Sequence, residues 1–296
     1  MNRIKPADYL PLLRAALKED LGRGGDVTTR FFVPANARLK GRIVSRERGV
    51  ICGLEIAAAT FKACDARVKV RLLVKDGARV RPGQAVMTVS GGRAILTAER
   101  IALNFLQHLS GVASSTRRFV DRVRGTRAKI LDTRKTLPGW RALDKYAVAC
   151  GGGVNHRMGL YDAAMVKDNH YPGLNNRSYP QTRRATSRWI TLEKGARLLR
   201  RANPKIPLII ECDASSQVAR ALALKPEVIL LDNMRGARLR REIHRIRRIA
   251  PRVKIEVSGG VDYGDIRALA RLGPDRISIG RLTHSAPALD LGLDLA

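Results

Sequence analysis

Six short apolar segments recur along the second part of the chain, and each is followed by polar residues or glycine. The segments end near residues 131, 166, 210, 231, 257 and 279. The last four ends are separated by about 21 to 26 residues, which is the length of one strand followed by one helix. The intervening segments 218–224 and 266–272 have the apolar spacing of helices. Strands that alternate with helices predict a parallel sheet.

Two architectures are compatible with this alternation. An α/β barrel carries its active site at the carboxyl ends of its strands. An open, doubly wound sheet binds ligands at the same ends. Six successive strands whose ends carry reactive or phosphate-binding residues favour the barrel. Both architectures bring the residues that follow the strands into one cleft.

The first third of the chain mixes strands with helices. An amphipathic helix is predicted within residues 1–22, and strands are predicted at 67–74 and 84–90. A helix is expected over 96–109, with Gly91-Gly92 before it and Gly111 after it as its ends. The tail 289–295 (LDLGLDL) alternates like a strand, and we expect it to return to the N-terminal sheet.

The large net positive charge of the chain is only weak evidence about its binding partner. The chain of 296 residues has 56 basic and 26 acidic residues, giving a net charge of +30. Such an excess is typical of proteins that bind polyanions such as nucleic acids. Aromatic residues make up only 4% of the chain, so platforms for stacking single-stranded bases are scarce. Most of the basic residues are arginines, which GC-rich genomes also favour. We therefore do not expect nucleic acid as a partner.

Cysteine spacing and hydropathy exclude several other classes. The four cysteines form no CxxC pair, which argues against a disulfide framework or a zinc site. No apolar run reaches the roughly 18 residues that a membrane helix needs. The first residues lack the apolar core of a signal peptide, so we expect a cytoplasmic protein without a membrane partner.

The densest chemical cluster in the sequence is basic. Arg134, Lys135, His156, Arg157 and Lys167 all lie at or near predicted strand ends. Arginine binds a carboxylate with two parallel hydrogen bonds, and lysine acts as a point charge. The cluster therefore predicts a substrate that carries carboxylates or phosphates.

Carboxylates and glycines follow the later strands. Glu211 and Asp232 could hold ribose hydroxyls or a Mg²⁺ ion that bridges a pyrophosphate, or each could pair with a nearby arginine. Ser258-Gly259-Gly260 and Ser278-Ile279-Gly280 close two successive strands. Glycine lets backbone N–H groups approach an anion, and the loops after the last strands of a barrel often bind phosphate.

These motifs resemble the quinolinate phosphoribosyltransferase family over nearly the whole chain. The residues that carry the resemblance are 19–22 (EDLG), 25–29 (GDVTT), 53–55 (GLE), 97–100 (TAER), 103–111 (LNFLQHLSG), 132–136 (DTRKT), 152–157 (GGVNHR), 167–170 (KDNH), 231–234 (LDNM), 258–261 (SGGV) and 282–285 (LTHS).

The resemblance implies an incomplete α/β barrel of the type II phosphoribosyltransferase kind, preceded by an N-terminal α/β sandwich. The implied sandwich covers residues 1–115 and is joined by the tail 283–296, while the barrel covers 116–282. It also implies a homodimer, or a higher oligomer, with active sites built from both subunits.

The implied reaction joins quinolinate to phosphoribosyl pyrophosphate with loss of CO₂, in NAD biosynthesis. Arg134, Arg157 and Lys167 would hold the quinolinate carboxylates, with Lys135 and His156 close by, and Arg100 would come from the partner chain. Glu211 and Asp232 would hold the ribose or Mg²⁺. The phosphate would lie on Ser258, Gly259, Gly260 and Gly280, with Ser278 beside them. The residues that the resemblance implies in catalysis are Lys135, Lys167, Glu211 and Asp232.

The sequence departs from the family between Lys167 and Glu211. Tyr171 follows His170, and the connection is longer by roughly fifteen residues, which predicts a surface loop over 171–189. Two alternatives stay open. One is a related phosphoribosyltransferase-like enzyme acting on another anionic heterocycle, and the other is a non-catalytic nucleic-acid-binding protein, which rests on net charge alone.

Overall fold

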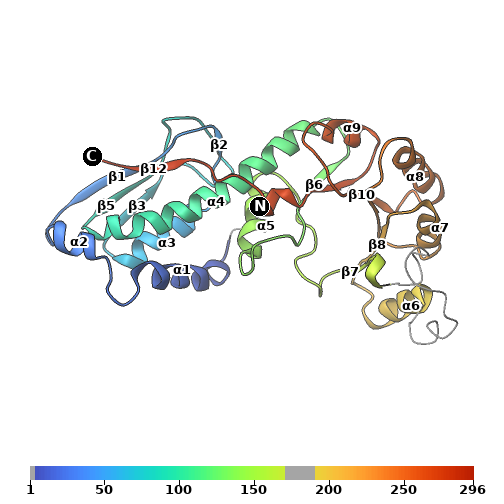
Figure 1. Ribbon diagram of the computed structural model, residues 1–296, viewed down its shortest axis with the longest axis horizontal. Coiled ribbons are helices and arrows are strands. Elements are labelled where there is room, and N and C mark those ends of the chain that lie inside the picture. Colours follow the sequence, from blue (N-terminus) through green and yellow to red (C-terminus); the bar gives the residue numbers. More distant parts are fainter. Residues whose placement is uncertain (1–3, 171–190) are drawn as a thin grey trace. The chain divides into compact units, whose positions relative to one another are not determined.

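The computed structural model describes residues 4–170 and 191–296, so the predicted loop over 171–189 lies outside the described residues. The chain forms two compact units (Figure 1). The first unit contains the residues up to Asp121 together with Lys135–Asn155 and Gly280–Ala296. The second contains Arg122–Arg134 and His156–Ile279. Segment Lys135–Asn155 therefore packs with the first unit, whereas the resemblance implies a barrel domain that includes it.

The first unit contains a four-stranded antiparallel sheet in the order β12-β1-β5-β3. Two of its strands confirm the predicted strands at 67–74 and 84–90. The predicted return of the tail is also confirmed, because β12 pairs with β1 from Ser45↔Leu291 to Gly41↔Leu295. The strand bounds are Leu39–Ser45 for β1, Lys69–Leu72 for β3, Ala85–Gly91 for β5 and Leu291–Leu295 for β12, and Gly49–Val50 (β2) pairs separately with Arg79–Val80 (β4).

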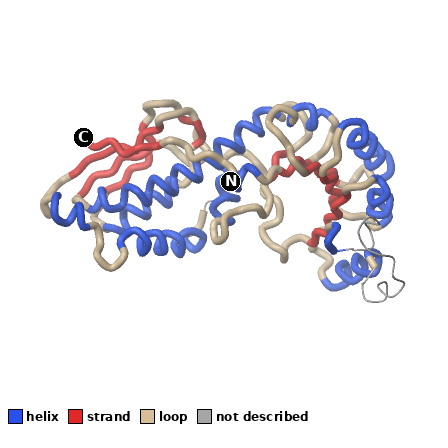
Figure 2. The backbone as a smooth tube through the Cα atoms, in the orientation of Figure 1, coloured by secondary structure: helices blue, strands red, loops and turns tan. Residues whose placement is uncertain are grey.

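Helices pack against this sheet and bury its apolar side chains (Figure 2). Ile43 on β1, Met87 on β5 and Leu106 on α4 are all fully buried in the resulting core. The helices of the first unit are α1 (Pro6–Leu21), α2 (Val27–Phe32), α3 (Leu54–Cys64), α4 (Ala94–Arg122), α5 (Arg141–Cys150) and α10 (Arg281–His284).

Helix α4 is longer than its sequence pattern predicts. Gly111 was expected to end the helix, but it lies inside α4, which continues to Arg122. The glycine serves a close approach between chain segments: a Cβ atom at this position would lie 2.1 Å from the carbonyl oxygen of Pro287. The missing side chain lets the C-terminal tail pass along α4 on its way to β12.

The second unit contains six parallel strands in the order β6-β11-β10-β9-β8-β7. The strands curve, with helices on their outer side (Figure 2). The strands are β6 (Lys129–Leu131), β7 (Ala164–Val166), β8 (Leu208–Cys212), β9 (Val228–Asp232), β10 (Lys254–Ser258) and β11 (Arg276–Ser278). The helices are α6 (Leu192–Ala202), α7 (Ser215–Ala223), α8 (Gly236–Ile249) and α9 (Ile266–Arg271), with a 3-10 turn at Asp168–His170.

The barrel is incomplete, as predicted. The last strand, β11, returns to pair with the first, β6, but in the described residues β6 and β7 do not pair. In chain order, α5 comes between β6 and β7, and α5 packs within the first unit. The strand ends lie within two residues of the positions predicted from the apolar segments.

Helix α8 carries many arginines on its exposed side. Leu239, Ile243 and Ile246 are buried, as their spacing predicts. Ile249 continues the same spacing, but it is 55% exposed because it is the last residue of the helix. Within the described residues, no helix is both long enough and apolar enough to cross a membrane.

Asp275 ties the start of β11 to its surroundings. Its carboxylate accepts hydrogen bonds from the Ile255 backbone N–H at 2.8 Å and from Arg247 at 2.5 Å, and Arg127 lies 2.9 Å away. Burial acts to raise the pKa of Asp275, but these hydrogen bonds and charges outweigh it, so the pKa is lowered.

We expect Asp275→Asn to lower the free energy of unfolding by about 1–3 kcal/mol at neutral pH. A lowered pKa contributes stability that is present above the ordinary value of 3.8 and is lost as the pH falls through the folded-state pKa. The difference from wild type should therefore shrink as the pH falls below that value. Urea unfolding at several pH values would test this, with Asp265→Asn at the exposed start of α9 as the control. A difference in the free energy of unfolding that does not change with pH would contradict a lowered pKa of Asp275.

Candidate active site at the strand ends

The second unit places most of the predicted site residues at the carboxyl edge of its sheet. This follows from the parallel direction of the strands, because each strand delivers its last residue to the same edge. Arg134 follows β6, Lys167 follows β7, Glu211 lies near the end of β8, and Asp232, Ser258 and Ser278 are the last residues of β9, β10 and β11.

Two arginines form the cationic part of this edge. Arg157 donates from Nη1 to the carbonyl of Ala163 at 2.9 Å, and its Nη2 lies 3.7 Å from the sulfur of Met165. Burial lowers the pKa of Arg157, and the positive charge of Arg134 lowers it further. Arg134 Nε is buried without a hydrogen-bond partner among the described residues. Two partly desolvated, mutually repelling cations are suited to an anionic ligand.

Lys167 and Glu211 form an ion pair at the neighbouring strand ends. Lys167 Nζ lies 2.6 Å from Glu211 Oε2, and the lysine side chain is 40% exposed. Pairing with an arginine was one expectation for Glu211, but its partner here is a lysine. Asp232 accepts a hydrogen bond from the Asn233 side chain at 2.7 Å. In both Glu211 and Asp232, the second carboxylate oxygen takes no part in these two contacts.

The glycine loop after β10 packs tightly against the turn after β9. Gly259 and Gly260 have φ angles of +90° and +47°, a region that favours glycine. A Cβ atom on Gly259 would lie 2.1 Å from Asn233 Oδ1. Arg235 donates to the carbonyls of both glycines, with 2.8 Å to that of Gly260. These contacts hold the loop in one conformation.

Sequence reasoning missed two residues of this loop. Asn233 has a left-handed φ of +53° and donates its N–H to the carbonyl of Ser258 at 3.1 Å. Arg235 belongs to an arginine-rich run in the sequence and lies just before α8 begins. The motif 231–234 (LDNM) was a signal for Asn233, whereas one arginine in an arginine-rich run carried no signal of its own.

A group of buried polar side chains surrounds Glu256 on β10. Glu256 is fully buried on β10, and Ser278 donates a hydrogen bond to its Oε1. His156 Nε2 lies 3.2 Å from the same oxygen, and the His156 N–H donates to Asp132 at 2.8 Å. Glu256 was missed because it lies inside an apolar strand. A charged residue flanked by Ile255 and Val257 was the available signal.

Arg100, Lys135 and Gly280 belong to the first unit and are described within it. The carbonyl of Lys135 accepts a hydrogen bond from Thr283 Oγ1 at 2.7 Å, and a Cβ on Gly280 would lie 2.9 Å from Lys135 Cδ. Arg100 on α4 borders a cavity of about 300 Å³, together with Asp26 and Thr97.

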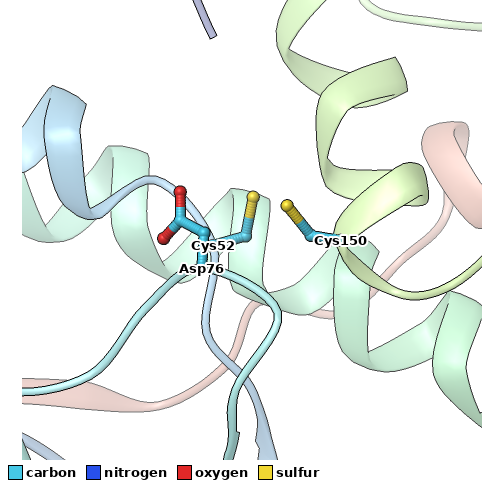
Figure 3. Close-up of side chains that lie close together, drawn as sticks. All are labelled: Cys52, Asp76 and Cys150. Atoms are coloured by element: carbon cyan, nitrogen blue, oxygen red, sulfur yellow. The ribbon is translucent and has the colours of Figure 1, made fainter. Parts of the chain in front are cut away.

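A second cluster in the first unit has a structural explanation. Cys52, Asp76 and Cys150 place one ligand-type atom each within 4.8 Å of one another (Figure 3). Asp76 accepts hydrogen bonds from the N–H groups of Gly53 and Leu54 at 3.1 Å and from Tyr146 at 2.8 Å, which anchors the start of α3. Burial raises the pKa of Cys52, so little thiolate is present.

The incomplete barrel and its strand edge define an enzyme scaffold for small anionic substrates. The family model described as "Quinolinate phosphoribosyl transferase, C-terminal domain" matches residues 112–294, and the corresponding N-terminal domain model matches 26–110. The chain therefore belongs to the quinolinate phosphoribosyltransferase family and is a pentosyltransferase.

Individual relatives agree with this placement. The "Nicotinate-nucleotide pyrophosphorylase [carboxylating]" of Mycobacterium leprae is 43% identical over 286 residues, covering 96% of this chain and 95% of the relative. The solved structure of the nicotinate-nucleotide pyrophosphorylase from Francisella tularensis has a TM-score of 0.88 at 32% identity, covering 100% of this chain and 98% of that one. The Ehrlichia chaffeensis enzyme has a TM-score of 0.87 at 37% identity, and both chains are fully covered.

We expect Gly259→Ala to weaken the binding of inorganic phosphate at least about tenfold, because the new methyl group would displace Asn233 and open the loop. Isothermal titration calorimetry would measure the dissociation constant. Gly264→Ala is the matched control, because a Cβ at Gly264 has no heavy atom within 4 Å. Equal affinities in the two variants would contradict a phosphate role for the loop.

Proposed function

We propose that this chain transfers the phosphoribosyl group of phosphoribosyl pyrophosphate to quinolinate, with decarboxylation. The products are nicotinate mononucleotide, pyrophosphate and CO₂, and the reaction belongs to NAD biosynthesis. The relatives named above carry the names of this activity. The observation that best supports the substrate class is the pair of partly desolvated arginines, Arg134 and Arg157.

The arginine pair accounts for binding of a dicarboxylate. A carboxylate between Arg134 and Arg157 would relieve their repulsion and would give the buried Arg134 Nε a hydrogen-bond acceptor. Lys167 offers a third cation, on a side chain already anchored to Glu211. These contacts would orient the pyridine ring so that its nitrogen faces the ribose.

The chemistry then requires positioning and charge stabilisation. The ring nitrogen uses its lone pair to form a bond to the ribose C1, and the C1–O bond to pyrophosphate breaks with both electrons leaving on oxygen. The 2-carboxylate later leaves as CO₂, its electron pair stays on the ring carbon, and a proton replaces it there. Preorganised cations stabilise such charge shifts, so no covalent nucleophile is needed.

The loop after β10 is proposed to hold the 5-phosphate. Ser258, Gly259 and Gly260 supply backbone close to the ligand, and Asn233 and Arg235 fix their conformation. The resemblance also implies a phosphate role for Gly280, which belongs to the first unit.

Mg²⁺ is proposed as the cofactor, held by Glu211 and Asp232. The donor set fits, because Mg²⁺ prefers oxygen ligands and binds through one or two carboxylates together with substrate phosphates. Each carboxylate has one oxygen engaged by a neighbour, Lys167 or Asn233, and a second that could serve the ion. When bound, the ion would neutralise negative charge on the leaving pyrophosphate.

A cytoplasmic homodimer with shared active sites is also proposed. Arg100 borders the same cavity as Val27 at the start of α2, and Phe31 and Phe32 of that helix are 74% and 83% exposed. Exposed aromatic side chains of this size are typical of a subunit interface. Phosphoribosyl pyrophosphate is highly charged and is retained inside cells, which supports the compartment.

The direct test is release of pyrophosphate by the purified protein. We expect release only when quinolinate, phosphoribosyl pyrophosphate and Mg²⁺ are all present, with one CO₂ formed per pyrophosphate. A panel containing nicotinate and other anionic heterocycles would distinguish a related activity. Equal turnover of nicotinate, or turnover of another heterocycle alone, would overturn the quinolinate assignment.

Arg134→Ala should lower kcat/KM for quinolinate by an amount equivalent to about 2–5 kcal/mol, the usual cost of removing one partner from a buried charge contact. Steady-state kinetics at saturating phosphoribosyl pyrophosphate would measure it. Arg241→Ala removes an exposed arginine from α8 and serves as the control for net charge. An unchanged kcat/KM in Arg134→Ala would reject the role of Arg134.

A further inference from the structure

Both ring nitrogens of His156 face groups of the protein. Nδ1 lies 2.6 Å from the backbone nitrogen of Arg157 and accepts its N–H. Nε2 lies 3.2 Å from Glu256 Oε1. A nitrogen that accepts a hydrogen bond holds a lone pair, so the ring proton resides on Nε2, which lies at ion-pair distance from Glu256 Oε1 but without the geometry of a hydrogen bond. The ring therefore has one defined tautomer.

Glu256 is placed to impose this tautomer. Its carboxylate is fully buried, whereas the His156 side chain is 7% exposed. Ser278 donates to Oε1, the oxygen that also faces His156, while Arg276 approaches Oε2 at 3.9 Å. A buried carboxylate is costly unless its neighbours donate to it. Ser278 makes that hydrogen bond, and the negative charge of Glu256 favours the His156 proton on the nearby Nε2.

The His156 ring also holds the backbone of Arg157. Because Nδ1 accepts the backbone N–H of Arg157, the orientation of the ring sets the position of the backbone at that residue. The His156 N–H is held in turn by Asp132 at 2.8 Å. A rotated ring would release the Arg157 N–H and allow the guanidinium to shift.

We propose that Glu256 is a positioning residue that acts through His156 to place Arg157 for the quinolinate carboxylates. His156 then serves by its fixed orientation and does not exchange a proton with the substrate. This inference rests on the proposed function, because its kinetic readout is the affinity for quinolinate.

Four variants test the coupling by steady-state kinetics. We expect Glu256→Ala to raise the KM for quinolinate about tenfold or more, with less than about a twofold change in the KM for phosphoribosyl pyrophosphate. Glu256→Gln keeps an acceptor oxygen and should restore most of the loss. The double variant His156→Ala/Glu256→Ala should be no worse than His156→Ala alone, since residues that act through one another are not additive.

The proposal would be overturned if the double variant raised the KM for quinolinate by the product of the two single effects. It would also be overturned if Glu256→Ala raised the KM values for quinolinate and phosphoribosyl pyrophosphate equally. Glu242→Ala is the matched control, because Glu242 is also a buried glutamate but lies on α8 with Arg245 as its ion-pair partner. Thermal unfolding of each variant separates loss of function from loss of fold.

A measurement on the unmodified enzyme keeps the proposal testable if Glu256→Ala does not fold. Nitrogen-15 NMR of the histidine rings, assigned with His156→Asn, should show the proton of His156 on Nε2. A proton on Nδ1 would overturn the proposal. An inactive wild-type protein with the Nε2 tautomer would instead count against the proposed function, so the two failures are distinguishable.

Discussion

Six parallel strands point their carboxyl ends toward one edge of the sheet in the second unit, and most groups with a proposed chemical role there depend on that direction. Residues 134, 167, 211, 232, 258 and 278 are far apart in the sequence, yet each lies at or next to the end of a strand. The backbone hydrogen bonds between neighbouring strands fix the register, so the side chains need no contacts of their own to be brought together. Side-chain contacts then determine how each group is oriented.

The basic residues fall into two groups that differ in their exposure to solvent. Arg134 and Arg157 are partly desolvated and repel one another, and Lys167 is held by Glu211. Most arginines of α8 are exposed and solvated, so they contribute to net charge without defining a site. The partner class follows from the few cations that are partly desolvated, because a lower dielectric strengthens their attraction for an anion.

Close approach of neighbouring chain segments explains why two positions are glycine. Gly111 admits the tail beside α4, and Gly259 admits the side chain of Asn233. In both places a methyl group would overlap an oxygen atom at 2.1 Å. From the sequence, Gly111 is predicted to end a helix and Gly259 to belong to a phosphate loop. Only the segment that packs against each glycine shows why it is needed.

The periodicity of apolar residues determined the strand ends, the helices between them and the return of the tail, because these depend on local spacing and on burial of one face. The motifs at the strand ends also indicated the family and its anionic substrates. The sequence did not indicate that α5 packs with the first unit, that α4 continues past Gly111, or that Glu256 faces His156 and Ser278. Those features depend on contacts between segments distant in the chain, and a pattern along one segment carries no information about which partner it will meet.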